Sequence, residues 1–274
     1  MATASKVVVL IHGLWMTPYS WQPWVERYEA RGFTVHTPGY PGIGQGKEGV
    51  EAIRRDPSPL AGLGVADVVN SLAEQIEALD EAPIIMGHSF GGAFVQLLLD
   101  RGYGAAGVSI DGAGVKGVKA LPLAQIKSTF PVLKNPANRD KAVPITEEEF
   151  HYAFTNNLTA EQSKPIYDEY AIPVSGRMLF EAGFANFTPH SSMTLDFGND
   201  DRAPLLFIAG GNDHAVPAAV QAENYKKWAK KSEAITAHRL FEGRDHYTCG
   251  EEGWETVADF ALDWALNPVA GELT

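Results

Sequence analysis

The stretch APIIMGHSFGGAFVQLLLD, residues 82–100, contains the pattern that decides the fold. It begins with an apolar run that predicts a buried strand and ends, from Phe90 onward, in an amphipathic helical pattern. Between the two, residues 87–91 match Gly-x-Ser-x-Gly, which places Ser89 on a sharp strand-to-helix turn with its hydroxyl above the sheet. Side chains at positions 87 and 91 would collide across that turn, so glycine fits there. The other interpretation is an ordinary turn in which Ser89 caps the helix.

A reactive serine needs a base, and the base needs an acid to orient it. Chain order after this motif is Ser, then Asp or Glu, then His. The apolar run at 204–209 leads into a loop that contains Asp213, and the run at 235–241 leads into a loop that contains His246. Both loops lie at the carboxyl ends of predicted parallel strands, where ligands bind in open α/β sheets. Ser89, His246 and Asp213 are therefore the predicted catalytic residues.

Each of these assignments has a rival. Asp111 ends the strand before residue 115, where a minority of enzymes with such sheets place the acid, and Asp245 directly precedes His246. Asp213 itself has the alternative role of a turn residue after two glycines. His214 follows the predicted acid directly and is interpreted as a loop residue.

A developing oxyanion needs two fixed N–H donors. One is predicted to be the backbone N–H of Phe90, because the first turn of a helix has free N–H groups and a favourable dipole. The second is predicted to be the N–H of Leu14, in the loop that follows the apolar run 7–11. In that loop Gly13 permits the turn, and the His12 imidazole is expected to brace the backbone.

The rest of the chain repeats short apolar runs followed by helical patterns, which is typical of βαβ units around a parallel sheet. The predicted strands are Lys6–Ile11, Phe33–His36, Pro83–Met86, Ala106–Ile110, Pro204–Ala209 and Ile235–Phe241. The predicted helices are Tyr19–Ala30, Val65–Leu79, Phe90–Asp100, Ala218–Lys230 and Trp254–Trp264. The fold class is thus α/β, with a doubly wound, mostly parallel sheet of about six strands.

Residues 115–199 interrupt this alternation. The segment is rich in proline and shows short helical patterns at 146–155 and 160–170, with no strand expected. We therefore expect a core formed by residues 1–114 and 200–274, with 115–199 as a helical cap inserted over one end of the sheet.

The 274 residues carry a formal net charge of −12, which disfavours nucleic acid and anionic membranes as partners. Cys249 is the only cysteine, so the chain cannot form an internal disulfide, as is usual in reducing compartments. Residues 1–6 show no leader pattern, and the apolar run that follows is too short to span a membrane. A cytoplasmic location is expected. Metal-ligand spacings are absent from the sequence, and no metal or cofactor is predicted.

Together these features resemble the α/β-hydrolase fold family, and small bacterial esterases and related cofactor-free enzymes in particular. The resemblance rests on Ile11-His12-Gly13, the loop 39–44, the motif 87–92, Asp213 and His246. It implies hydrolysis of a small ester through an acyl-enzyme. The chain departs from the family in two ways: the first two strands of the family have no counterpart, and Gln45 follows the Pro-Gly-x-Gly loop where the family has serine.

The expected partner is a small, apolar ester, and the oligomeric state is not predicted. Aromatic side chains are candidates for the pocket wall, although aromatics at helical spacing are more often core. They are Trp15, Phe130, Phe154, Tyr167 and Phe184. Two alternatives stay open for the function. One is a hydroxynitrile lyase or perhydrolase with the same fold, and the other is a small-molecule sensor that retains the three residues.

Overall fold

Seven parallel strands form the central sheet of this computed structural model, which describes residues 5–274. The strand order is β2-β1-β3-β4-β7-β8-β9, and every neighbouring pair is parallel. The strands are β1 Val7–Ile11, β2 Thr34–His36, β3 Ile84–His88, β4 Ala106–Ile110, β7 Leu205–Gly210, β8 Thr236–Phe241 and β9 Gly271–Leu273. The predicted α/β class is confirmed, with β9 as an edge strand that the sequence did not predict. The expectation about a leader falls largely on residues 1–4, which lie outside the described residues.

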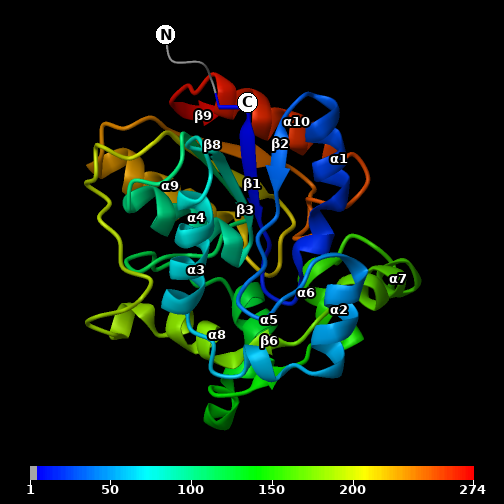
Figure 1. The fold of residues 1–274 in the computed structure, drawn as a ribbon. Coiled ribbons are helices and arrows are strands. Elements are labelled where there is room, and N and C mark those ends of the chain that lie inside the picture. The colour runs from blue at the N-terminus through cyan, green and yellow to red at the C-terminus, as the bar shows by residue number, and fades with distance from the viewer. Residues whose placement is uncertain (1–4) are drawn as a thin grey trace.

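Helices cover both faces of the sheet (Figure 1). Alternate residues of β1 point to opposite faces: Val8 and Leu10 pack with α1 and α10, whereas Val9 and Ile11 pack on the side of α3, α4 and α9. These helices are α1 Gln22–Ala30, α3 Val65–Glu77, α4 Phe90–Asp100, α9 Ala218–Lys231 and α10 Trp254–Leu266. All five correspond to predicted helices, and a further helix, α2 Gly46–Arg55, was not predicted.

The strand and the helix of the opening motif lie within the core. Every residue of β3 is buried, and so is every residue of α4 except its last, Asp100. Gly91 lets α4 approach the end of β1 closely, because a methyl group there would lie 2.3 Å from the carbonyl oxygen of Ile11. The first turn of α4 therefore packs directly against the end of β1, next to the turn between β3 and α4.

The segment between β4 and β7 contains α5 Leu123–Leu133, α6 Glu147–Phe154, α7 Ala160–Tyr170 and α8 Gly176–Gly183. The helices expected at 146–155 and 160–170 are present, but the expectation of no strand was wrong. Two-residue strands, β5 Ala142–Val143 and β6 Val174–Ser175, pair antiparallel. Figure 1 shows α5 to α8 gathered beyond the end of the sheet opposite the C-terminus, which is the carboxyl end of β1. Short 3₁₀ turns lie at Pro18–Trp21, Ser58–Leu60, Pro136–Asn138 and Ala185–Phe187.

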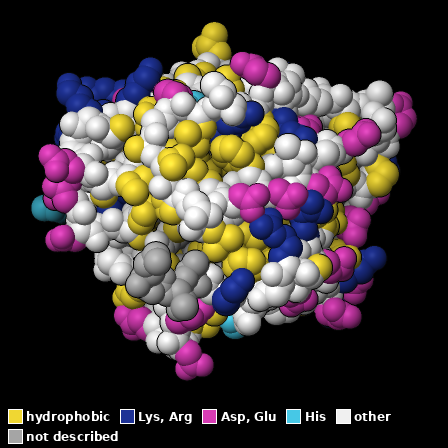
Figure 2. Space-filling model, turned by 90° about the horizontal axis from the view of Figure 1, so that it is seen from above, with side chains coloured by type: hydrophobic (Ala, Val, Ile, Leu, Met, Phe, Trp, Pro, Cys, Tyr) yellow, Lys and Arg dark blue, Asp and Glu magenta, His cyan; other side chains and the backbone are white. Residues whose placement is uncertain are grey.

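The opposite end of the molecule carries mixed charges around hydrophobic side chains (Figure 2). Nearby, ion pairs join α1 to α10: Arg27 lies 2.5 Å from Asp259, and Arg31 lies 2.5 Å from Asp263. These side chains are at least one third exposed, so each pair adds at most about 1 kcal/mol to stability. Among the described residues, no helix is both long and apolar enough to cross a membrane.

The loop after β1 is braced by His12. Its imidazole is buried, stacks on the Tyr40 ring and donates from Nδ1 to the carbonyl oxygen of Gly13 at 2.8 Å. The Tyr40 hydroxyl donates to the carbonyl oxygen of His12. Burial lowers the pKa of His12 to about 4, so the ring is neutral near pH 7. The structure thus gives His12 the bracing contact that the sequence predicted.

We predict that Gly91→Ala destabilises the fold. The added methyl group would lie 2.3 Å from the Ile11 oxygen and 2.8 Å from the His12 oxygen, both of which belong to the backbone. Crowding of this kind costs about 1–3 kcal/mol or more, which exceeds the gain of about 1 kcal/mol in helix propensity. Urea unfolding measures the difference. Gly183→Ala in α8 is the control, because its nearest neighbour is a flexible Leu133 methyl at 3.3 Å. Equal effects of both substitutions would contradict the prediction.

Stability should fall as pH falls from about 6.5 to about 4, with His12 as one cause. In this range the unfolded chain protonates His12 and the folded chain does not, so protons favour unfolding. A pKa near 4 instead of 6.5 corresponds to about 3 kcal/mol. His12→Asn, whose amide can replace the Nδ1–H donor, should flatten the pH dependence of the unfolding free energy. His190→Asn, at an exposed position, controls for the loss of one histidine. Parallel curves for wild type and His12→Asn would refute this assignment.

Candidate active site

Ser89 lies in a strained turn between β3 and α4. Its backbone has φ 57° and ψ −120°, a region that non-glycine residues rarely adopt. Hydrogen bonds hold the turn: the Ser89 N–H donates to the Ile110 oxygen at 2.9 Å, and the Ser89 oxygen accepts from Gly92 and Ala113 N–H. The neighbouring strand and the following helix therefore fix this conformation, and the residue as a whole is 8% exposed.

His246 and Asp213 reach Ser89 from the loops after β8 and β7. His246 Nε2 lies 2.9 Å from Ser89 Oγ, and His246 Nδ1 lies 2.7 Å from Asp213 Oδ2. His246 and Asp213 are both buried. The three side chains come from distant parts of the sequence and form one unbroken series of hydrogen bonds.

The second oxygen of Asp213 fixes the orientation of the carboxylate. Oδ1 accepts the N–H groups of Ala215 at 2.7 Å and Val216 at 2.8 Å. Because a carboxylate only accepts, the proton of neutral His246 belongs on Nδ1, and Nε2 is left to accept from the Ser89 hydroxyl. This tautomer is the one that a general base for Ser89 requires.

The two predicted oxyanion donors belong to segments that meet near Ser89. Phe90 is the first residue of α4, and Leu14 lies in the loop after β1. Neither N–H donates to a backbone acceptor within residues 5–274. Gly13 brings the loop close, because a methyl group at this position would lie 2.8 Å from Ser89 Cβ. The loop that contains Leu14 therefore lies close to Ser89, and the role of the two N–H groups as oxyanion donors stays a prediction.

His88, inside the motif itself, holds the backbone of His246. Its Nε2 donates to the His246 carbonyl oxygen at 2.7 Å, and the two rings lie 4.6 Å apart. Burial, together with the neighbouring His246, keeps the pKa of His88 well below its usual range, so the ring is a neutral donor. The sequence did not assign this role to His88, although its place next to Ser89 was a usable signal.

The rival residues have other contacts. Both oxygens of Asp245 accept backbone N–H groups, from Tyr247 at 3.0 Å and Asn157 at 3.1 Å. Burial, with the nearby Glu251 charge, raises the pKa of Asp245 to about 8. His214 Nδ1 donates to the Tyr152 oxygen at 3.0 Å and thus joins its loop to α6. Asp111 is buried near His246 without bonding to it.

His88, Asp111 and His246 place potential metal-ligand atoms within 4.8 Å of one another. Both nitrogens of His246 are already hydrogen-bonded, to Asp213 and Ser89, and His88 Nε2 is bonded to a carbonyl oxygen. A metal ion here would have to break the series that joins Ser89 to Asp213. The donor set therefore fits proton transfer better than metal binding.

Two of the five predicted aromatic residues lie at the site. The Phe154 ring packs edge-on against His246 at 4.9 Å and against Trp15 at 6.1 Å. Tyr167 instead packs on Phe150 and donates its hydroxyl to a backbone oxygen of the same segment. Phe130 and Phe184 are 57% and 49% exposed on the surface of the α5–α8 segment.

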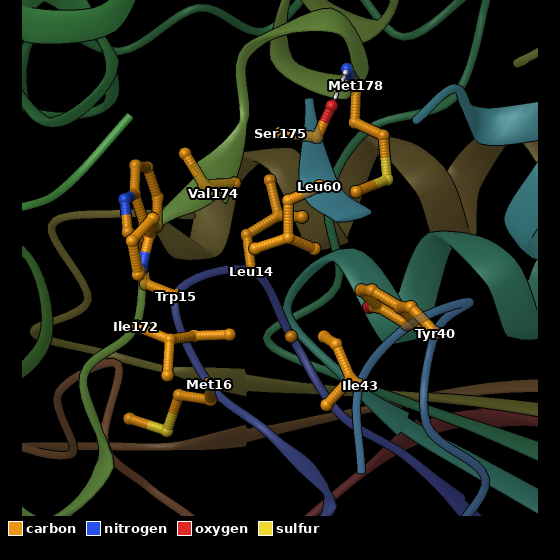
Figure 3. Close-up of a pocket in the computed structure, with 12 residues that line it drawn as sticks. Leu14, Trp15, Met16, Tyr40, Ile43, Leu60, Ile172, Val174, Ser175 and Met178 are labelled. Atoms are coloured by element: carbon orange, nitrogen blue, oxygen red, sulfur yellow. Dashed lines mark hydrogen bonds between the residues drawn. The ribbon is translucent and has the colours of Figure 1, made fainter. Parts of the chain in front are cut away.

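A narrow apolar pocket begins at the loop that carries Leu14 (Figure 3). Figure 3 shows Leu14 near the centre, with Trp15 and Val174 on the left, Tyr40 on the right and Met178 above; Val174 and Met178 come from the α5–α8 segment. The lining residues are Gly13, Leu14, Trp15, Met16, Tyr40, Ile43, Leu60, Ile172, Pro173, Val174, Ser175 and Met178. Apart from Trp15, the sequence did not predict this wall, because it depends on segments far apart in the chain.

Comparison with solved structures shows the same fold at low sequence identity. The Paleococcus ferrophilus monoacylglycerol lipase superposes with a TM-score of 0.66 at 19% identity, over 96% of each chain. A methylesterase from Arabidopsis gives 0.65 at 14% identity, over 94% of this chain and 97% of the other. A pyrethroid hydrolase from Sphingobium faniae gives 0.59 at 20% identity, over 96% and 98%.

At the level of sequence, no curated protein matches this chain. A model of the Alpha/beta hydrolase family, by contrast, matches residues 8–260. This match spans nearly the whole sheet and includes the turn at Ser89 and the loops of Asp213 and His246. The chain belongs to the alpha/beta hydrolase family.

Proposed function

We propose that this protein is a serine hydrolase that cleaves a small, apolar ester, with Ser89 as nucleophile, His246 as general base and Asp213 as the orienting acid. The observation that carries the proposal is the series of hydrogen bonds from Asp213 through His246 to Ser89, at 2.7 and 2.9 Å. The strained backbone of Ser89 adds support, because strain of this kind concentrates at functional sites. The solved neighbours include a lipase, a methylesterase and a pyrethroid hydrolase by name.

In the first half-reaction Ser89 Oγ attacks the ester carbon while His246 Nε2 takes its proton. Asp213 stabilises the imidazolium that forms and keeps the ring in its productive orientation. The negative charge on the carbonyl oxygen is held by the N–H groups of Leu14 and Phe90, the second of which belongs to the first turn of α4. His246 then protonates the leaving alcohol, and the acyl group stays on Ser89.

In the second half-reaction water attacks the acyl-enzyme. His246 takes a proton from this water, and the same two N–H groups hold the second oxyanion. His246 returns the proton to Ser89 as the carboxylic acid leaves. The reaction needs no metal and no cofactor.

The segment 115–199 acts in this proposal as a cap that supplies part of the substrate pocket. Phe154 of α6 contacts His246, and the Ile172 N–H donates to the Trp15 oxygen at 2.9 Å. Val174 and Met178 face the loop that carries Leu14. The pocket borders one of the oxyanion donors and is almost entirely apolar, so we assign it to the acyl chain of the substrate.

Ser89→Ala should abolish both fluorophosphonate labelling and ester hydrolysis, because it removes the attacking oxygen. Loss of a catalytic-triad member lowers kcat by about 10⁴-fold or more. Labelling followed by gel fluorescence, and hydrolysis of p-nitrophenyl acetate, measure the two effects. Ser128→Ala is the matched control: Ser128 is buried like Ser89, but its Oγ lies 3.0 Å from the carbonyl oxygens of Ala124 and His214, to which its single proton is donated. Labelling that persists in Ser89→Ala would overturn the assignment of the nucleophile.

Val174→Phe should shorten the range of acyl chains that the enzyme accepts. The larger ring would fill the pocket opposite Leu14 and displace long chains, while an acetyl group would still fit. We expect kcat/KM for p-nitrophenyl octanoate to fall about tenfold or more, with little change for the acetate. Val269→Phe, at an exposed position, is the control. A parallel loss for both esters would contradict the assignment of the pocket to the acyl chain.

A further inference from the structure

Trp15 has a backbone conformation that is rare for a large side chain. It lies in the loop after β1, directly after Leu14, and its φ is 61°. The other non-glycine residues with a positive φ in the described chain are Ser89 and Asp111, and both lie beside His246. Residues held in this region concentrate at functional sites, because the surrounding structure has to compensate for the strain. The strain at Trp15 therefore points to a role at the same site.

The Trp15 indole is buried with an unused hydrogen-bond donor. The residue is 7% exposed, and its Nε1–H has no hydrogen-bond partner among residues 5–274. The Phe154 ring lies edge-on to the indole at 6.1 Å between centroids, and an aromatic face is only a weak acceptor. Because the indole nitrogen can only donate, its burial without an acceptor is costly. An acceptor that enters with a ligand would remove this cost.

The indole lies between the apolar pocket and the candidate catalytic residues. Trp15 forms part of the pocket wall, at the left of Figure 3. On its other side it packs against Phe154, which in turn packs against His246. Leu14, the predicted oxyanion donor, is the preceding residue in the chain. An acyl group that is held at the nucleophile and extends into the pocket therefore passes close to the indole.

The other polar side chains of the pocket wall already have partners. Besides Trp15, only Tyr40 and Ser175 contribute polar side-chain atoms to the wall. The Tyr40 hydroxyl donates to the His12 carbonyl oxygen, and the Ser175 hydroxyl donates to the Leu63 carbonyl oxygen at 2.6 Å. The Trp15 N–H is thus the one unpaired side-chain donor in the wall that residues 13–178 form. In a mostly apolar pocket, a single polar group of this kind sets orientation and specificity.

We propose that the Trp15 Nε1–H is the specificity-determining donor of the acyl pocket, and that the substrate carries an oxygen acceptor within an otherwise apolar acyl chain. This inference rests on the proposed function. The donor is oriented before the substrate binds, because the Trp15 carbonyl oxygen accepts the Ile172 N–H at 2.9 Å and holds the loop against the α5–α8 segment. An acyl chain of the same shape without the oxygen leaves the N–H unpaired and reacts more slowly.

Paired p-nitrophenyl esters test the proposal. In each pair one ester ends in a methyl ketone and the other in an isopropyl group of nearly the same shape. Three chain lengths are used: 4-oxopentanoate with 4-methylpentanoate, 5-oxohexanoate with 5-methylhexanoate, and 6-oxoheptanoate with 6-methylheptanoate. Trp15→Phe removes the N–H and keeps an aromatic ring. At the length that reaches the indole, this variant should lower the ratio of kcat/KM for the keto ester to that for the alkyl ester by about tenfold or more.

Trp21→Phe is the matched control. Trp21 is also buried, and its Nε1 also lacks a partner within residues 5–274, but it does not line this pocket. Its ratio should equal the wild-type ratio at every chain length. A ratio that Trp15→Phe leaves unchanged at all three lengths, or that Trp21→Phe lowers equally, would overturn the proposal.

A binding measurement covers the case in which Trp15→Phe does not fold. In Ser89→Ala, which should bind the esters without turnover, the ¹H resonance of the Trp15 indole N–H should move downfield with one of the keto esters and not with its alkyl partner. Equal shifts with both members of every pair would also overturn the proposal. Failure of the proposed function is distinguishable, because it shows as absent fluorophosphonate labelling of the intact protein, whereas this binding needs no reaction at Ser89.

Discussion

The close contact between α4 and the end of β1 sets the geometry of the whole site. Gly91 can approach the carbonyl oxygens of Ile11 and His12 because it has no side chain, and Gly87 likewise lies against the Gly91 backbone. The turn next to this contact holds Ser89 with φ 57°. The contact also brings the loop of Leu14 against the first turn of α4. One packing interaction therefore brings together Ser89, the first turn of α4 and the loop that contains Leu14.

Most of the fold was predictable because long, buried elements leave strong patterns. The residues from Phe90 to Leu99, for example, are apolar or small apart from Gln96, and all ten are buried in α4. The missed elements have weaker signals. Strand β9 has three residues at a sheet edge, and β5 and β6 have two each. Helix α2 contains two glycines and many charges, and α5 contains Pro131 in its interior, which the sequence alone favours as a helix end.

The residues of the site also fall into two groups, those with a strong sequence signal and those without one. Chain order and strand ends sufficed to select Ser89, Asp213 and His246, and the structure brings these three together; their catalytic roles stay a prediction. The pocket was not predictable, because its wall joins the loops at 13–16 and 40–43 to strand β6, and no local pattern encodes that meeting. Phe130 and Phe184 illustrate the limit of prediction from sequence. The sequence does not reveal whether an aromatic side chain faces solvent, the core or a substrate, and these two face solvent.

Burial, not the net charge of −12, controls the electrostatics around Ser89. Water screens the surface charges, whereas the histidines and carboxyl groups beneath the turn are shielded from it. Burial lowers the pKa values of His12 and His88, so both rings are weak bases, and only His246 contacts the Ser89 hydroxyl. Asp111 is likewise kept protonated. In the proposed mechanism, proton transfer from Ser89 therefore places the His246 imidazolium beside the Asp213 carboxylate in a buried site.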